Sequence, residues 1–142
     1  MRIAAGVFLL IASIFNGCAG LGYAGLGGGS AAIGAAAEKS EGVTADDGTK
    51  VEITPEAKAA AAEMKSKGGT WFMLGVFLLV VMGLQIGGGV VLFMNKAATF
   101  VLIAGVLGLG AEIWSGSTSS FGVLNAPGFV ASILAIVAAM GM

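Results

Sequence analysis

Three polar side chains interrupt long apolar segments of this sequence, and they are the residues best placed to do chemistry: Asn16, Gln85 and Glu112. Amides inside apolar helices form interhelical hydrogen bonds or line a pathway for an ion or solute. A carboxylate there can bind a proton or a cation in a cavity. Because Trp114 follows closely, Glu112 is also interpreted as an acid that reaches interfacial water. Both interpretations stay open for each residue.

Other reactive side chains are scarce. The 142 residues include no histidine and a single cysteine, Cys18. This composition removes the usual zinc, haem and iron–sulfur ligand sets, and also the Ser-His-Asp and Cys-His pairs of nucleophilic enzymes. Asp46 and Asp47 lack the ligand spacing of a calcium loop and are interpreted as part of a solvated turn. We expect no enzyme, no metal and no cofactor.

The composition is that of a membrane protein. Hydrophobic residues make up 57% of the chain and charged residues 11%, against roughly 25% charged in soluble proteins. Twelve of the fifteen charged side chains lie between Glu38 and Lys67. The net charge is −1 and there is no basic patch, so membrane lipid is the expected partner and nucleic acid is not.

The charge-free runs are long enough to span a bilayer, which needs about 20 apolar residues in a helix. We predict an all-α fold, a four-transmembrane-helix bundle that forms one membrane domain over residues 1–142. The predicted crossings are about 3–23, or longer to 36, then 71–94, 97–114 and 123–142. A tight turn at Asn95–Lys96 separates the second crossing from the third.

A polar loop, residues 38–70, is predicted between the first two crossings. Pro55 suits the first position of a helix, and Gly68 suits its end, so a surface helix is predicted over about 55–67. The turn signal Asp47-Gly48 and the alternating residues after it predict a short hairpin.

The glycine-rich stretch at 19–38, AGLGYAGLGGGSAAIGAAAE, has several interpretations. It contains a GxGxxG pattern, but the strand and parallel sheet that nucleotide binding needs are missing. Phe15-Asn16-Gly17-Cys18 resembles a lipobox, in which case Cys18 is lipidated, residues 1–17 are removed and three crossings remain. The favoured interpretation is close helix packing.

Small residues four apart let membrane helices approach each other closely. The sequence repeats this spacing in every predicted crossing, and the predicted helix-packing residues are Gly20, Ala24, Gly28, Gly83, Gly87, Ala104, Gly108, Ala131 and Ala135. Such faces predict a homo-oligomer or a place in a larger membrane complex.

Three family resemblances follow from these patterns. The run GLGGGSAAIGAAAE resembles the glycine-ladder helix of rotor-ring subunits of rotary ATPases, although this chain has no carboxylate at the middle of a crossing. The order of a long loop, a tight turn and a short loop is similar to claudins and tetraspanins, whose loop cysteines are missing here. In composition the chain resembles small bacterial four-helix integral membrane proteins, which implies a bacterial cytoplasmic membrane.

Two functional hypotheses follow. The first is a non-catalytic structural or interaction subunit that assembles through its small-residue helix faces. The alternative is an oligomeric conduit for an ion or small solute, lined by the three polar residues above. Five lysines place the 38–70 loop in the cytoplasm, whereas its predicted hairpin and helix are typical of an extracytoplasmic domain, so both orientations stay open.

Overall fold

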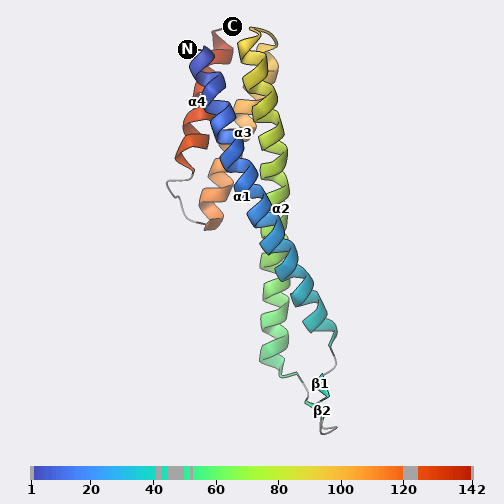
Figure 1. The fold of residues 1–142 in the computed structure, drawn as a ribbon. Helices are drawn as coiled ribbons and strands as arrows, with labels where there is room; N and C mark the ends of the chain where they lie inside the picture. The colour runs from blue at the N-terminus through green and yellow to red at the C-terminus, as the bar shows by residue number, and fades with distance from the viewer. Residues whose placement is uncertain (1, 41–42, 45–49, 52, 120–124, 142) are drawn as a thin grey trace. The chain divides into compact units, whose positions relative to one another are not determined.

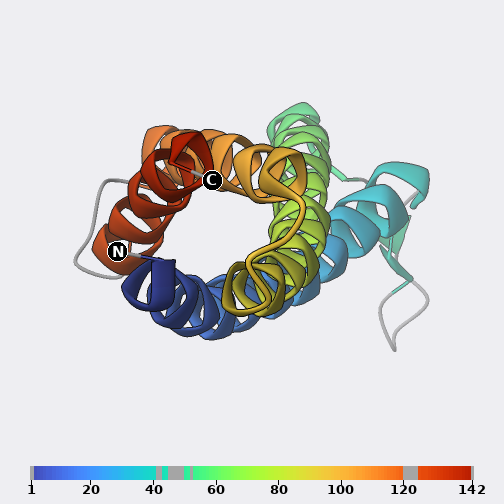
Figure 2. The same ribbon diagram turned by 90° about the horizontal axis from the view of Figure 1, so that it is seen from above.

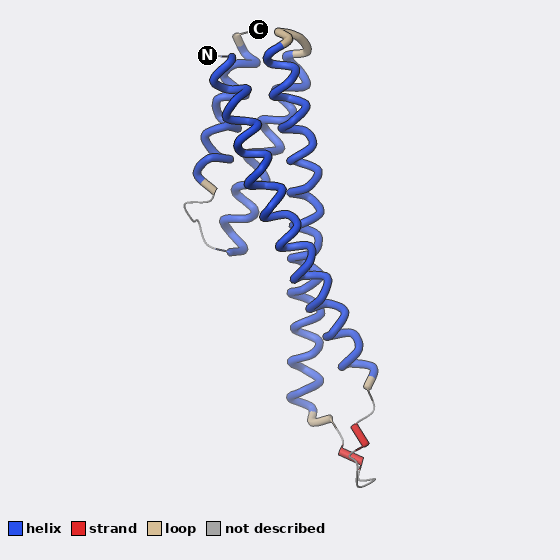
Figure 3. Tube along the Cα trace, viewed as in Figure 1, coloured by secondary structure: helices blue, strands red, loops and turns tan. Residues whose placement is uncertain are grey.

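The computed structural model describes residues 2–40, 43–44, 50–51, 53–119 and 125–141. Within them the chain forms four α-helices, α1 (Arg2–Lys39), α2 (Pro55–Phe93), α3 (Ala98–Ser119) and α4 (Ala126–Met140) (Figure 1). Two short strands, β1 (Val43–Thr44) and β2 (Lys50–Val51), pair antiparallel between α1 and α2. Figure 3 shows how fully helices dominate the chain. The predicted turn at Asp46–Gly48 lies outside the described residues.

Three of the described helices, α1, α2 and α3, are long and apolar enough to cross a membrane. The protein is therefore a helical, membrane-associated protein. The described part of α4 is also apolar but has 15 residues, about 22 Å at 1.5 Å per residue. It is shorter than the crossing predicted at 123–142.

The helix predicted over 55–67 does not end at Gly68. Instead α2 continues without a break from Pro55 to Phe93, so residues 55–70 are its first turns rather than part of a loop. The physical reason is that Gly68 is buried against α1, where a Cβ atom would lie 2.7 Å from the Gly27 carbonyl oxygen. Glycine makes room here for a second backbone, and the packing against α1 offsets its cost of about 1 kcal/mol within a helix.

The chain divides into two compact units, which are described separately: unit 1 is residues 1–21 and 76–142, and unit 2 is residues 22–75. Unit 1 combines the first part of α1 and the second part of α2 with α3 and α4. Seen along the helices, these four segments follow one another in chain order around a common centre (Figure 2).

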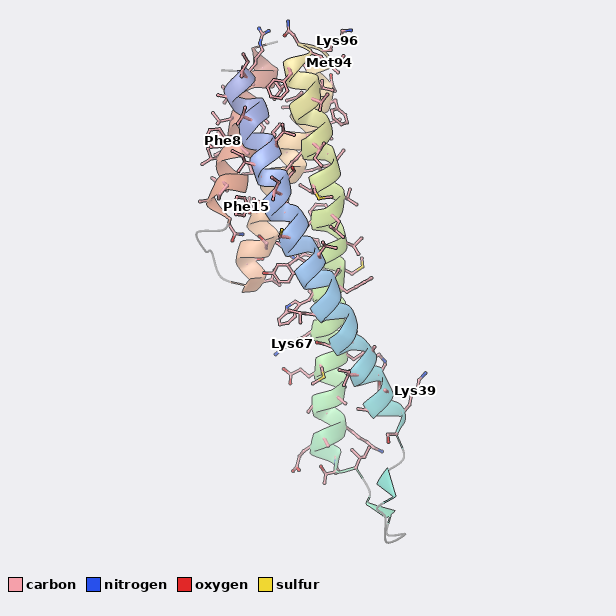
Figure 4. All side chains as sticks on the ribbon, in the orientation of Figure 1. Phe8, Phe15, Lys39, Lys67, Met94 and Lys96 are labelled. Atoms are coloured by element: carbon pink, nitrogen blue, oxygen red, sulfur yellow. The ribbon has the colours of Figure 1, made fainter. Side chains whose placement is uncertain are left out.

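Apolar side chains fill the interior of unit 1. The buried cluster consists of Ala5, Leu9, Ala12, Leu92, Val101, Ala131, Ala135, Ala138 and Ala139. Large apolar side chains also lie on the outside: Phe8 and Phe15 of α1 are each 39% exposed (Figure 4). An apolar exterior around an apolar interior is what lipid as a solvent requires.

Both chain ends of unit 1 lie at the end that holds the α2–α3 turn (Figure 1). There the Arg2 guanidinium donates to the Asn95 side chain and lies 3.5 Å from the Gly141 carbonyl oxygen. The predicted tight turn is present at this end. Asn95 and Ala97 take left-handed backbone conformations, with φ of 53° and 51°, which asparagine tolerates better than alanine.

Unit 2 is an antiparallel helical hairpin, made from the end of α1 and the beginning of α2. The short β1–β2 ladder connects the two helices, in the region where a hairpin was predicted. Near its tip, the Lys65 ammonium forms an ion pair of 2.8 Å with the Glu38 carboxylate. The other ion pair among the described residues joins Lys67 and Glu63 within α2.

Candidate functional site

The two amides singled out by the sequence meet inside unit 1. Asn16 of α1 is 5% exposed and Gln85 of α2 is fully buried. The Asn16 Nδ2 donates to the Gln85 Oε1 at 3.0 Å. A buried amide must find such a partner, because an unpaired polar group in an apolar interior is costly.

The carboxylate of α3 joins the same group of side chains. Glu112 is 3% exposed, so the structure differs from the interpretation of an acid in interfacial water. Its carboxyl group lies close to the side chains of Asn125 and Asn16. Asn16 therefore neighbours both Glu112 and Gln85, and the three polar residues predicted from the sequence lie in one network.

The beginning of α4 packs directly onto this carboxylate. A Cβ atom on Gly128 would overlap the Glu112 Oε1, so a larger residue at this position would have to displace the Glu112 side chain. Asn125 precedes α4 without capping it; its Nδ2 instead donates to the Ser115 Oγ at 2.6 Å. The carboxylate thus lies against the first turn of α4.

A second layer of polar groups surrounds Gly108. The Gln85 Nε2 is buried and has no hydrogen-bond partner among the described residues. A Cβ atom on Gly108 would lie 3.1 Å from this nitrogen and 2.6 Å from the Ser132 Oγ. Ser132 donates to the Gly128 carbonyl oxygen at 2.8 Å. The missing side chain at Gly108 lets both polar groups come close to α3.

Sequence reasoning missed Asn125, Ser115 and Ser132 as members of this network. Ser132 carried a usable signal, because it is a hydroxyl within an otherwise apolar helix. The other two lie in the polar segment around the α3–α4 connection, where polar residues are ordinary. Only the fold shows that they turn inward.

The charge of this network is unusual because no basic side chain belongs to it. Arg2 is engaged at the end of unit 1, and both described ion pairs lie in unit 2. Within the described residues there is also no group of three or more His, Cys, Asp or Glu that could hold a metal ion. The network therefore consists of one acid with neutral amides and hydroxyls, which suits it to hydrogen bonding and proton binding.

The predicted helix-packing residues are placed unevenly. Those buried in the structure are Gly20, Ala104, Gly108, Ala131 and Ala135, while Ala24, Gly28 and Gly87 are half-buried. A Cβ atom on Gly87 would contact the Phe100 ring at 3.1 Å. Gly83 is exposed and faces open space, so the structure shows no packing role for it.

The close backbone contacts between α1 and α2 involve Gly27 and Gly34, which are seven residues apart and which the four-residue rule did not single out. In unit 2 a Cβ atom on Gly27 would overlap the backbone nitrogen of Phe72, and one on Gly34 would lie 2.6 Å from the Ala61 carbonyl oxygen. In unit 1 a Cβ atom on Gly89 would lie 3.1 Å from the Gly6 carbonyl oxygen. We call these glycines and Gly68 the inner seam between α1 and α2.

The opposite side of α1 is open. Among the described residues, no neighbouring atom lies within 4 Å of a Cβ position on Gly22, Gly25 or Gly29, and Leu26 and Ile33 are 67% and 63% exposed. Cys18 is also exposed on α1.

The chain matches no protein-family model, no curated protein and no solved structure.

Proposed function

We propose that this protein is a non-catalytic integral membrane subunit that assembles with a second copy, or with a larger membrane complex, through the outer face of α1. The observation that carries the proposal is the unpartnered outer face in unit 2. The proposed subunit crosses the membrane four times, with α4 in the last crossing. Arg2 near Gly141 supports placing both chain ends on one side.

The small residues of the inner seam are already used within the chain. In unit 2, Gly27 and Gly34 of α1 pack against the backbone of α2. They are therefore not available to a partner. An interface with another chain needs a different set of small residues, on a face that the hairpin leaves uncovered.

The outer face of α1 supplies such a set. These small residues are all exposed and follow one another at alternating spacings of three and four: Gly22, Gly25, Gly29, Ala32 and Ala36. This spacing places them on one stripe of a helix. Small side chains let a second helix approach closely, and the large apolar side chains beside the stripe add surface to bury.

The polarity of the neighbouring helix strengthens the case for a protein partner. Residues 55–70 of α2 carry five charged side chains, whereas residues 22–37 of α1 carry none. These two segments pack side by side in unit 2, as the contact between Gly34 and Ala61 shows. Charged side chains indicate an aqueous level, where an apolar stripe that includes Leu26 and Ile33 is costly unless another chain covers it.

The rival function, an oligomeric ion or solute conduit, is supported by the network that joins Asn16, Gln85 and Glu112. A conduit needs polar surface along its whole length. Toward the end of unit 1 that holds the chain ends, the described interior is the apolar cluster that includes Leu9, Leu92 and Val101. We therefore place the conduit second.

The proposed interface is tested by a bulky substitution on the outer face. Gly25→Leu is expected to shift the protein from an oligomer or complex toward a monomer, measured by native mass spectrometry in mild detergent. Gly110→Leu is the matched control, because Gly110 also faces open space but lies on α3. It is expected to leave the assembly unchanged.

A cross-link locates the contact independently. In a Cys18→Ser background, Ala32→Cys is expected to give a disulfide-linked dimer on mild oxidation if two copies pair along this face. A complex without such a cross-link indicates a different partner chain. A wild-type protein that is strictly monomeric, with nothing co-purifying, would contradict the proposed function.

A further inference from the structure

We propose that Glu112 is a proton-binding site, which exchanges its proton on the side of unit 1 where α3 ends and α4 begins. The proposal does not rest on the assembly function above. It starts from a carboxyl group that is almost completely buried in a bundle of membrane-spanning helices. An ionisable residue in such a place marks a functional site more often than a structural one.

The groups that face Glu112 are neutral. Asn16 comes from α1 and Asn125 from the beginning of α4, and Gln85 of α2 reaches it through Asn16. On α3 itself, the Ser115 Oγ donates to the Glu112 carbonyl oxygen at 3.1 Å. None of these neighbours titrates or carries a charge. An ionised carboxylate without a counterion is costly in an apolar interior, and a proton removes that charge with no other change in the site.

A proton fits this site better than a metal ion. An ionised carboxylate has only acceptors, so a neighbouring amide stabilises it with its N–H group and not with its oxygen. Such an arrangement offers few oxygen ligands for sodium, and calcium needs six to eight of them. The described residues also hold no cluster of acids around Glu112.

The chemistry of the step is simple. Water or hydronium supplies the proton, an O–H bond forms on one Glu112 carboxylate oxygen, and no bond within the protein breaks. The new hydroxyl is a donor, so one neighbouring amide must turn its oxygen toward it. The unpartnered Gln85 Nε2 gives the network a donor that is not yet committed, which allows the amides to rearrange.

The two sides of Glu112 differ in polarity, and this difference assigns the route of exchange. Toward the end of α3, hydroxyl groups follow at Ser115, Ser117 and Thr118, and the last two are exposed. In the opposite direction lies the buried apolar cluster around Leu9 and Val101. Protons need hydrogen-bonding groups or water to move, so the apolar side blocks them.

Infrared difference spectroscopy on the full-length protein in nanodiscs tests the proposal. The wild-type protein is expected to show a carboxylic-acid carbonyl band that changes with pH and shifts to lower frequency in D₂O. Glu112→Gln removes this band. Glu63→Gln is the matched control and leaves it in place, because Glu63 is an exposed acid paired with Lys67 in unit 2.

The route is tested in vesicles with the protein in one orientation. A pH jump on the side of the α3–α4 connection is expected to change the band at once, and the same jump on the other side is expected to have no effect. Equal responses from both sides would overturn the assigned route. Glu112→Asp, which keeps an acid, serves if Glu112→Gln fails to fold, and is expected to shift the band.

Two results would overturn proton binding itself. One is a wild-type protein without any pH-dependent band that depends on residue 112. The other is a band that responds to sodium at constant pH, with choline chloride as the reference salt, which would assign the site to a metal cation instead.

Discussion

The two units of this protein use the same pair of helices in different ways. In unit 2, α1 and α2 meet backbone to backbone at Gly27, Gly34 and Gly68, and these are the two helices of that unit. In unit 1 the same helices join α3 and α4 around a polar network and an apolar cluster. There the approach of Gly89 to the Gly6 backbone is less close, and other contacts involve larger, flexible groups, such as the Met82 side chain against Gly17.

This difference separates two sources of helix association in a membrane protein. Close backbone packing depends on shape alone and tolerates no added atom. A polar network depends on hydrogen bonds and tolerates small shifts, because amide and hydroxyl groups can re-pair. Substitutions in the two units are therefore expected to change the free energy of unfolding by different amounts. The effect of a substitution in the polar network should also depend on whether its hydrogen-bond partner is present.

The largest expected effect is in the inner seam of unit 2. Gly68→Ala places a methyl group against the backbone of α1, and we expect it to lower the free energy of unfolding by roughly 1–3 kcal/mol. Gly69→Ala is the matched control, since Gly69 follows Gly68 in the helix but faces open space. Thermal unfolding in detergent measures both, and equal stability of the two variants would contradict backbone packing at Gly68.

The polar network of unit 1 is expected to give a smaller, pairwise effect. A double-mutant cycle with Asn16→Ala and Gln85→Ala should show a coupling free energy of roughly 0.6–1 kcal/mol, typical of hydrogen bonds between membrane helices. Denaturation of the four proteins in the same detergent provides the measurement. Additive losses would mean that the two amides do not depend on each other.

The smallest expected effect is at the α2–α3 turn of unit 1. Ala97→Gly relieves a left-handed backbone strain of roughly 1 kcal/mol. It also raises the conformational entropy of the unfolded chain, which lowers the stability by about half of that amount. We expect a net stabilisation of about 0.5 kcal/mol by thermal unfolding. Asn95→Gly, at the other left-handed position, should give no such stabilisation, because asparagine already tolerates this conformation and its side chain accepts a hydrogen bond from Arg2.

The helical class could be predicted from the sequence because charge-free runs longer than the bilayer leave few alternatives. The predicted end at Gly68 was wrong because glycine has two meanings, a helix stop and a close contact, and only the neighbouring helix distinguishes them. The tight turn at Asn95–Lys96 was predictable because polar residues between two apolar runs have few other places to lie.

The site was predictable in part for a similar reason. Asn16, Gln85 and Glu112 are conspicuous because each is polar within an apolar run. Asn125 and Ser115 are not conspicuous, since their roles depend on which way their side chains turn. The burial of Glu112 also escaped sequence reasoning, because its nearness to Trp114 along the chain indicated an interface, and α4 covers it in the structure.

A contact pattern that repeats every seven residues has a weakness of its own. Sliding one helix past the other by two turns would again set small residue against small residue, so such a hairpin has several alignments of nearly equal quality. What selects one alignment must be features that occur once: the amide pair in unit 1 and the Glu38–Lys65 ion pair in unit 2. We expect the loss of either feature to affect the register of the two helices more than the free energy of their association.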